Sequence, residues 1–181
     1  MVFAPSDERL IKRALDNNKQ AWLQLISRYE RLVYNYALRM VGNRDDALDL
    51  MQEVFISVFR NLESWRGESS FKNWMMTIAH NRCIEHFRRR KIISDDSDVN
   101  EQVSEDAWHN PEQVYAGQQR GQQLFKAMQK LPVEQRMVVE LKFFQHLQLG
   151  DISKQLDVPL STVKSRLYGA ITKLQEWVEV V

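Results

Sequence analysis

The sequence contains little of several residue types, and each shortage excludes a class of structure. A single cysteine, Cys83, allows no internal disulfide, which fits a reducing compartment. Four prolines and six glycines in 181 residues are few for a turn-rich β-sandwich and favour helices. No apolar run approaches the roughly eighteen residues of a membrane span, and the first residues lack the regions of a signal peptide. We therefore expect a cytoplasmic protein without direct membrane insertion.

The charge is unevenly distributed along the chain. The formal net charge of +1 combines a net +5 over residues 1–93, −7 over residues 94–117 and +3 over residues 118–181. The middle segment contains seven acidic residues and neither lysine nor arginine. Its like charges and its Ser- and Asn-containing composition are typical of an extended linker. The sequence therefore predicts two small helical domains, 1–93 and 118–181, joined by an acidic linker.

Apolar residues in the first domain recur at intervals of three and four, which indicates amphipathic helices. The expected helices cover 7–16, 18–40, 45–62 and about 70–91. Ser6 is expected to cap the first helix and Gly42 to end the second. The expected interior includes Leu23, Leu48, Phe59, Phe71, Trp74 and Cys83.

The second domain shows the pattern of a helix-turn-helix. Helices are expected over 118–130, 133–144, 149–156 and 161–174, with a turn at Asp157–Leu160. Ser161 is expected to cap the last helix, whose first two turns would enter a major groove. The residues expected to project outward there are Thr162, Lys164, Ser165 and Tyr168. The alternative is an αα-hairpin with a solvated basic face, which we consider less favoured than DNA binding.

The fourth helix is a second candidate for nucleic-acid binding. Its outer face is expected to carry Asn73, Thr77, His80, Asn81, Ile84 and Arg88. Amide and hydroxyl groups can bond to exposed base edges, and the run from Arg88 to Lys91 can neutralise phosphates. Trp65 precedes the helix and can stack on an unpaired base. Phe71 and Trp74 lie on the apolar stripe, where the interior is the favoured position.

The polar side of the third helix carries Asp45, Asp46, Asp49, Gln52 and Glu53. These residues fit three alternatives. They could carry acid–base or metal chemistry, they could simply complement the helix dipole, or they could dock to a basic protein surface. The spacing of His80, Cys83 and His86 is similar to that of metal ligands, but it would require an outward-facing Cys83. We predict neither a metal nor a cofactor, and no enzymatic activity.

The order of these parts, and four stretches of sequence, resemble the extracytoplasmic-function group of bacterial RNA polymerase sigma factors. The resemblance covers about residues 8–176. The stretches that carry it are Asp46–Phe55, Phe71–Asn81, Leu131–Arg136 and Ser161–Leu167. It implies an all-α fold, with region 2 in the first domain and region 4 in the second. It also implies a function in promoter-specific transcription initiation; a stand-alone helix-turn-helix regulator is the alternative.

The resemblance assigns roles to individual residues. Core RNA polymerase is expected to bind at Asp46, Asp49, Gln52 and Glu53 through its clamp helices, and to contact region 4 through its flap. Asn81 matches the position that reads a base flipped from the minus-ten element, and Asn61–Ser70 matches the loop that holds this base. The full minus-ten set is Asn61, Trp65, Ser69, Ser70, Asn73, Thr77, Asn81 and Arg88. The minus-thirty-five set is Ser161, Thr162, Lys164, Ser165, Arg166 and Tyr168.

The chain departs from the family pattern at two positions of the last helix. Many members have basic residues where this chain has Gly169 and Ile171, which affects the expected minus-thirty-five contacts. His80 stands at a variable position and receives no role. Family members are commonly held inactive by an anti-sigma factor, so such a partner is expected here. The acidic linker is expected to avoid DNA and to suit a basic polymerase channel.

Overall fold

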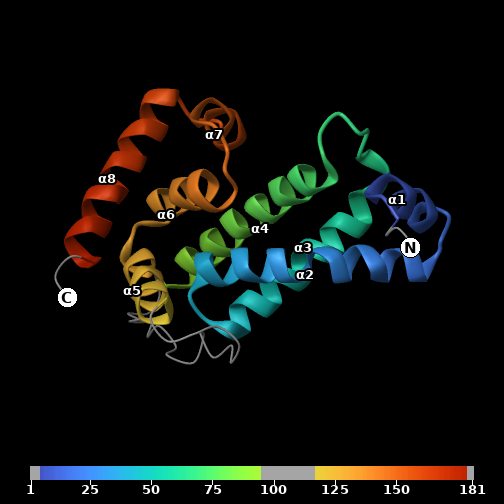
Figure 1. Cartoon of the computed structure of the whole chain (residues 1–181), viewed down its shortest axis with the longest axis horizontal. Coiled ribbons are helices and arrows are strands. Elements are labelled where there is room, and N and C mark those ends of the chain that lie inside the picture. Colours follow the sequence, from blue (N-terminus) through green and yellow to red (C-terminus); the bar gives the residue numbers. More distant parts are fainter. Residues whose placement is uncertain (1–4, 95–116, 179–181) are drawn as a thin grey trace. The chain divides into compact units, whose positions relative to one another are not determined.

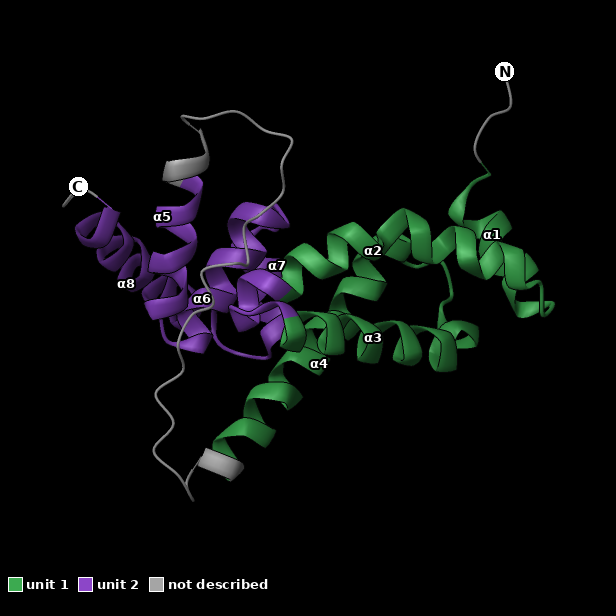
Figure 2. Ribbon diagram, turned by 90° about the horizontal axis from the view of Figure 1, so that it is seen from below, with its two compact units in different colours: residues 1–37, 45–100 green, residues 38–44, 101–181 purple. Residues whose placement is uncertain are grey.

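The computed structural model describes residues 5–94 and 117–178, and these residues form helices without any β-strand. The chain divides into two compact units, coloured separately in Figure 2. Unit 1 comprises Met1–Ala37 and Asp45–Asn100, and unit 2 comprises Leu38–Arg44 and Glu101–Val181. The expected all-α class with two helical domains is confirmed. The linker predicted over 94–117 falls almost entirely outside the described residues.

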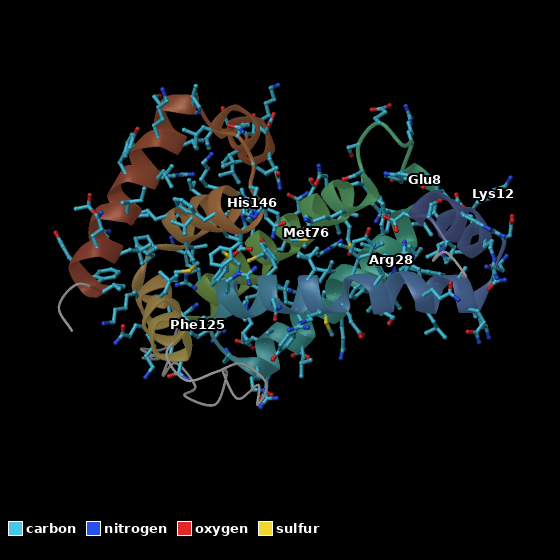
Figure 3. The ribbon with its side chains drawn as sticks, viewed as in Figure 1. Glu8, Lys12, Arg28, Met76, Phe125 and His146 are labelled. Atoms are coloured by element: carbon cyan, nitrogen blue, oxygen red, sulfur yellow. The ribbon has the colours of Figure 1, made fainter. Side chains whose placement is uncertain are left out.

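Unit 1 is built from α1 (Asp7–Leu15), most of α2 (Lys19–Val41), α3 (Arg44–Asn61) and α4 (Phe71–Ser94), with the short 3₁₀ helix η1 (Leu62–Ser64) after α3 (Figure 1). As predicted, Ser6 caps α1, because its hydroxyl oxygen accepts a bond from the N–H of Arg9. Asp7 bonds to Arg28 and Tyr29 of α2, which ties α1 to its neighbour; Arg28 is labelled in Figure 3.

The interior of unit 1 agrees only in part with the apolar pattern. Phe71 and Cys83 are buried as predicted, and Trp74 is half-buried. The prediction is wrong for Leu23, Leu48 and Phe59, which are exposed. Leu25, in contrast, is buried on α2. A spacing of three and four describes an apolar arc of a helix, but neighbouring helices cover only part of that arc.

Unit 2 contains α5 (Gly117–Lys130), α6 (Val133–Val139), α7 (Leu149–Leu156) and α8 (Leu160–Val178). The helix expected over 133–144 ends earlier, since Glu140–Phe144 forms the π-helical turn η3. α8 packs against α5, α6 and α7. Its buried residues Val163, Leu167 and Ala170 recur at intervals of four and three and hold α8 in the unit.

The turn between α7 and α8 forms the predicted helix-turn-helix. Asp157 adopts a left-handed conformation with φ of 51°, which ends α7. The prediction that Ser161 caps α8 is wrong. The helix begins at Leu160, and the N–H groups of Thr162 and Val163 bond to the carbonyl of Pro159. Ser161 therefore lies in the first turn of α8 with an exposed side chain.

Unit 2 buries two charged residues inside a hydrogen-bond network. Arg136, from the Leu131–Arg136 stretch, donates to the carbonyl oxygens of Met40, Gln129 and Leu131. Glu140 is fully buried and accepts bonds from Arg39 at 2.6 and 2.8 Å. The guanidinium of Arg39 also lies 4.2 Å from the centre of the Phe144 ring. Buried charges are tolerated where they are paired and hydrogen-bonded.

None of the helices in the described part of the chain is long and apolar enough to cross a membrane.

Candidate functional surfaces

The outer face of α4 carries most of the polar residues that were predicted there. Asn73, Thr77, Asn81 and Arg88 are exposed, at intervals of four, four and seven that place them on one side of the helix. The hydroxyl of Thr77 donates to the carbonyl of Asn73 at 3.0 Å, which directs it along the helix. The face therefore offers amide groups, which can hydrogen-bond to bases, followed along the helix by an arginine, which can bind a phosphate.

His80 was expected on this outer face, and that prediction is wrong. His80 is fully buried, and neither ring nitrogen has a hydrogen-bond partner within the described residues. Burial lowers the pKa of His80 to about 4, because the protonated ring loses its hydration. The buried arc of α4 includes Met76, labelled in Figure 3, as well as Met75, and is wider than the apolar spacing indicated. The ring is therefore neutral at pH 7.

The loop between α3 and α4 is held by its own side chains. The indole N–H of Trp65 donates to the carbonyl of Ser69 at 3.2 Å, which closes the loop. Asn61 donates to the carbonyl of Ser57 at 2.8 Å, which fixes the start of the loop to α3. Gly67 has φ of 74°, a conformation that other residues rarely adopt. The loop thus has a defined conformation next to the first turn of α4.

Ser70 caps α4, because its hydroxyl oxygen accepts a bond from the N–H of Asn73 at 3.2 Å. An aromatic cluster lies at this end of α4. The ring of Phe71 packs against Tyr29, Trp65 and Trp74, with centroid distances between 5.5 and 6.0 Å. Trp65 is half-buried, and its ring stands nearly perpendicular to that of Phe71. Phe71 therefore anchors the loop to the core of unit 1.

The acidic residues of α3 separate into two kinds. Asp49 and Gln52 are exposed. Glu53 accepts bonds from Nη2 of Arg89 at 2.8 and 2.9 Å, and Asp46 is paired with Arg90. Two arginines of the basic run on α4 are thus bonded to α3 instead of facing solvent alone. No motif in the sequence signals these pairs, because they join residues far apart in the chain.

The face of α8 agrees with its prediction except at Thr162, which was expected to project outward. Lys164, Ser165 and Tyr168 are exposed, and Thr162 and Arg166 are half-buried. The hydroxyl of Ser165 donates to the carbonyl of Thr162 at 3.0 Å. A Cβ at Gly169 would lie 3.0 Å from Nε2 of Gln135, so this position faces α6. Gly169 therefore lets Gln135 of α6 pack closely against α8.

Several exposed residues beside these surfaces were missed. Arg66 lies in the loop and Lys72 in the first turn of α4, where each can meet a phosphate. Ile56 is exposed on α3, four residues after Gln52. A signal for the two basic residues was present, since Arg66 lies within the predicted base-binding loop and Lys72 follows it closely. Within the described residues, no cluster of histidine, cysteine and carboxylate side chains suits a metal ion.

Two family models match this chain. The model for sigma-70 region 2 matches residues 25–92, which include α3, the loop and most of α4. The model for sigma-70 region 4 matches residues 121–174, which include the helix-turn-helix. The two matches thus cover the two surfaces described above.

Two characterised relatives align with this chain over about nine tenths of their length. The chain is 30% identical over 173 residues to the ECF RNA polymerase sigma-E factor of Escherichia coli, covering 91% of this chain and 90% of that protein. It is 29% identical over 178 residues to the RNA polymerase sigma-H factor of Pseudomonas aeruginosa, covering 94% and 92%. The chain belongs to the extracytoplasmic-function family of RNA polymerase sigma factors. Members of this family bind core RNA polymerase and direct promoter-specific transcription initiation.

Solved structures show the same fold. One is the sigma factor RpoE from Bartonella quintana, solved in complex with the anti-sigma factor NepR. It superposes with a TM-score of 0.72 at 24% identity, covering 87% of this chain and 96% of that chain. CnrH, solved with the cytosolic domain of CnrY, gives a TM-score of 0.64 at 18% identity, covering 96% and 97%.

Proposed function

We propose that the outer face of α4 and the loop before it bind the minus-ten element, and that the outer face of α8 binds the minus-thirty-five element. The observation that carries the proposal is the exposure of Asn73, Thr77 and Asn81 along one side of α4, next to a loop closed by Trp65. Such a surface suits an unstacked base, which needs hydrogen-bonding groups beside a shaped loop. Unpairing a base costs a few kcal/mol, which contacts in a pocket offset.

In this mechanism the two surfaces have different tasks. The first two turns of α8 grip duplex DNA in the major groove, with Lys164 and Tyr168 exposed toward it. The α4 surface captures one base after the duplex opens, with Asn81 at its centre, and Arg88 meets a phosphate. Holding the base outside the stack favours the melted state, since the closed duplex gains no such contact.

Core RNA polymerase is proposed to bind α3 through its clamp helices and unit 2 through its flap. α3 presents the acidic and amide side chains of Asp49 and Gln52 to solvent, which suit a basic partner. Binding of this kind gives the polymerase a sequence preference that it lacks alone. We infer from the family that the protein acts in the cytoplasm.

Run-off transcription with purified core polymerase on genomic fragments tests the whole proposal and identifies the promoter. Asn81→Ala is expected to lower specific transcripts, because one base contact is worth about 1–3 kcal/mol of discrimination. Gln20→Ala removes an exposed amide from α2 and is the matched control. Equal transcription from both variants would contradict the role of Asn81.

Lys164→Ala is expected to weaken promoter binding. The salt dependence of binding by this variant distinguishes a phosphate contact from a base contact. If Lys164 meets a phosphate, the slope of log affinity against log salt falls by about 1. Lys12→Ala on α1, at another exposed lysine, is the matched control. Unchanged binding by Lys164→Ala would exclude this part of α8 from the minus-thirty-five contact.

We further propose that an anti-sigma factor binds and regulates this protein; the structure of RpoE bound to the anti-sigma factor NepR supports this proposal. Affinity capture with the tagged chain, followed by mass spectrometry, identifies candidates. A captured protein supports the proposal only if it lowers run-off transcription when added in purified form.

The acidic segment is proposed to occupy a basic channel of the polymerase. Asp95, Asp96 and Asp98 lie outside the described residues, so this hypothesis depends on their charge alone. Neutralising the three residues is expected to change promoter escape more than promoter binding. Unchanged ratios of abortive to full-length transcripts would refute it.

A further inference from the structure

The N-terminal helix α1 lies outside the part of the chain that the region 2 family model matches. That match begins at residue 25, whereas α1 spans Asp7–Leu15. α1 nevertheless packs against η1, the short helix that leads from α3 into the loop closed by Trp65 (Figure 1). Its residues Leu10, Ile11 and Ala14 are buried in unit 1. α1 therefore lies beside the loop that is proposed to bind the minus-ten element.

The start of α1 is held to α2 by three hydrogen bonds. One carboxylate oxygen of Asp7 accepts a bond from Nη1 of Arg28, and the other accepts a bond from the hydroxyl of Tyr29. Nη2 of Arg28 donates to the carbonyl of Pro5 at 2.7 Å. The side chain of Asp7 is only 22% exposed, so salt and water screen these contacts weakly. Asp7 therefore restrains the side chains of two consecutive residues of α2.

The hydroxyl of Tyr29 is suited to remain the donor in this contact. Burial, followed by the hydrogen bond to Asp7, raises the pKa of Tyr29 above its ordinary value of 10.0, because both disfavour the phenolate. The hydroxyl therefore keeps its proton at neutral pH. The bond to Asp7 then fixes the outer end of the Tyr29 ring.

The ring of Tyr29 belongs to the aromatic cluster beside the loop. The rings of Tyr29 and Phe71 meet edge-on with centroids 5.5 Å apart, and those of Phe71 and Trp65 meet edge-on at 6.0 Å. Phe71 is buried, and a close-packed interior transmits strain from one side chain to the next. The indole N–H of Trp65 donates to the carbonyl of Ser69 and closes the loop. Continuous contacts therefore lead from Asp7 of α1 to the loop.

We propose that α1 positions the base-binding loop for minus-ten recognition, and that Asp7 and Tyr29 are its positioning residues. The inference rests on the proposed function, because it concerns the loop that is proposed to hold the unpaired base. Asp7 orients Tyr29, which supports Phe71. Phe71 in turn holds Trp65 in the arrangement that closes the loop. Such support matters because a binding site needs its groups within about 0.5 Å of their productive positions.

The first test follows the indole N–H signal of Trp65 by NMR in the free full-length chain, with Trp65→Phe to assign it. Asp7→Asn replaces one acceptor by a donor, and Tyr29→Phe removes the hydroxyl. Each is expected to shift the signal, because the support of the loop is weakened. The matched controls are Asp16→Asn, at the exposed aspartate that follows α1, and Tyr34→Phe, at a half-buried tyrosine of α2. Both controls are expected to leave the signal in place.

The second test measures how strongly the holoenzyme of each variant prefers an intact base. The probe is a single-stranded oligonucleotide with the non-template minus-ten sequence of a promoter found by run-off transcription, and an abasic nucleotide replaces each position in turn. The ratio of the Kd for the abasic probe to that for the intact probe is expected to fall about fivefold in Asp7→Asn and in Tyr29→Phe, since each loses one hydrogen bond.

The double variant shows whether the two residues act together. Because Asp7 and Tyr29 share one bond, combining Asp7→Asn with Tyr29→Phe is expected to lower the Kd ratio by no more than about twofold beyond either single substitution. Asp16→Asn and Tyr34→Phe are expected to keep the ratio of the wild type. Effects of the two substitutions that multiply would show that Asp7 and Tyr29 do not act as one unit.

Other outcomes also overturn the inference. A role limited to stability would lower the melting temperature and leave the indole signal and the Kd ratio unchanged below it. An indole signal that shifts while the Kd ratio stays the same would remove the role of α1 in recognition. If the wild-type holoenzyme binds every abasic probe as tightly as the intact probe, the proposed function itself is refuted, so the two failures are distinguishable.

Discussion

The two units bury polar groups in opposite ways. Unit 2 encloses Arg136 and Glu140, each with several hydrogen-bond partners. Unit 1 encloses His80, whose ring nitrogens have no partner among the described residues, so burial alone determines its protonation. A charge can be buried where the fold supplies partners, whereas an unpartnered group is buried only in its neutral form. The stability of unit 2 is therefore expected to depend on individual hydrogen bonds, and the stability of unit 1 is expected to depend on pH.

The largest expected effect is the loss of Arg136. Arg136→Ala leaves the carbonyl oxygens of Gln129 and Leu131 without their donor. We expect the free energy of unfolding of unit 2 to fall by about 3 kcal/mol. Urea denaturation followed by circular dichroism measures this change, with Arg31→Ala at an exposed position as the control. A loss below about 1 kcal/mol would show that the network contributes little.

His80 provides the next largest effect. Its pKa of about 4 in the folded state lies below the ordinary value of 6.5, so the unfolded chain binds the proton more readily. Stability from this group is therefore complete above pH 6.5 and falls as the pH drops from 6.5 toward 4. Between pH 7.5 and pH 5 we expect a loss of roughly 2 kcal/mol.

His80→Leu is expected to remove this part of the pH dependence, since leucine does not titrate. Thermal unfolding of both proteins between pH 5 and pH 7.5 measures the difference. Parallel curves for the wild type and the variant would mean that His80 takes up no proton on unfolding.

The loop of unit 1 is expected to respond more weakly. Gly67→Ala must adopt φ of 74°, although no atom lies within 4 Å of the added Cβ. We expect a loss of about 1 kcal/mol from backbone strain alone. Gly121→Ala is the matched control, because the same methyl enters open space within α5 and is expected to stabilise by up to about 1 kcal/mol. Equal changes in the free energy of unfolding for the two substitutions would contradict the predicted backbone strain at position 67.

The smallest effect is expected for an exposed ion pair. Nη1 of Arg82 lies 2.7 Å from Oε2 of Glu85 on one face of α4. This pair is much more exposed than the pair of Arg39 and Glu140 in unit 2. Arg82→Ala is expected to change the free energy of unfolding by at most about 0.5 kcal/mol, because water screens the pair. A change as large as that of Arg136→Ala, measured by the same denaturation, would remove the distinction between the units.

Sequence patterns predicted the helices and the helix-turn-helix well, because both depend on residues close together in the chain. The exposed residues of α8 followed directly from their spacing, since one side of that helix packs in a regular way. His80, Leu48 and Phe59 were placed incorrectly because their burial depends on which other helices lie nearby. The pairs of Glu53 with Arg89 and of Asp46 with Arg90 join different helices, so no local pattern contained them.

Cys83 gives a practical consequence. The thiol is fully buried in α4, and a buried thiol reacts slowly with alkylating reagents. It is also the only cysteine of the chain, so a cysteine introduced at an exposed position is the single fast-reacting thiol. A maleimide dye then labels a chosen position, such as 23 on α2 or 124 on α5, without first removing the native residue. Fluorescence from such a dye can follow the assembly of the protein with polymerase and DNA in real time.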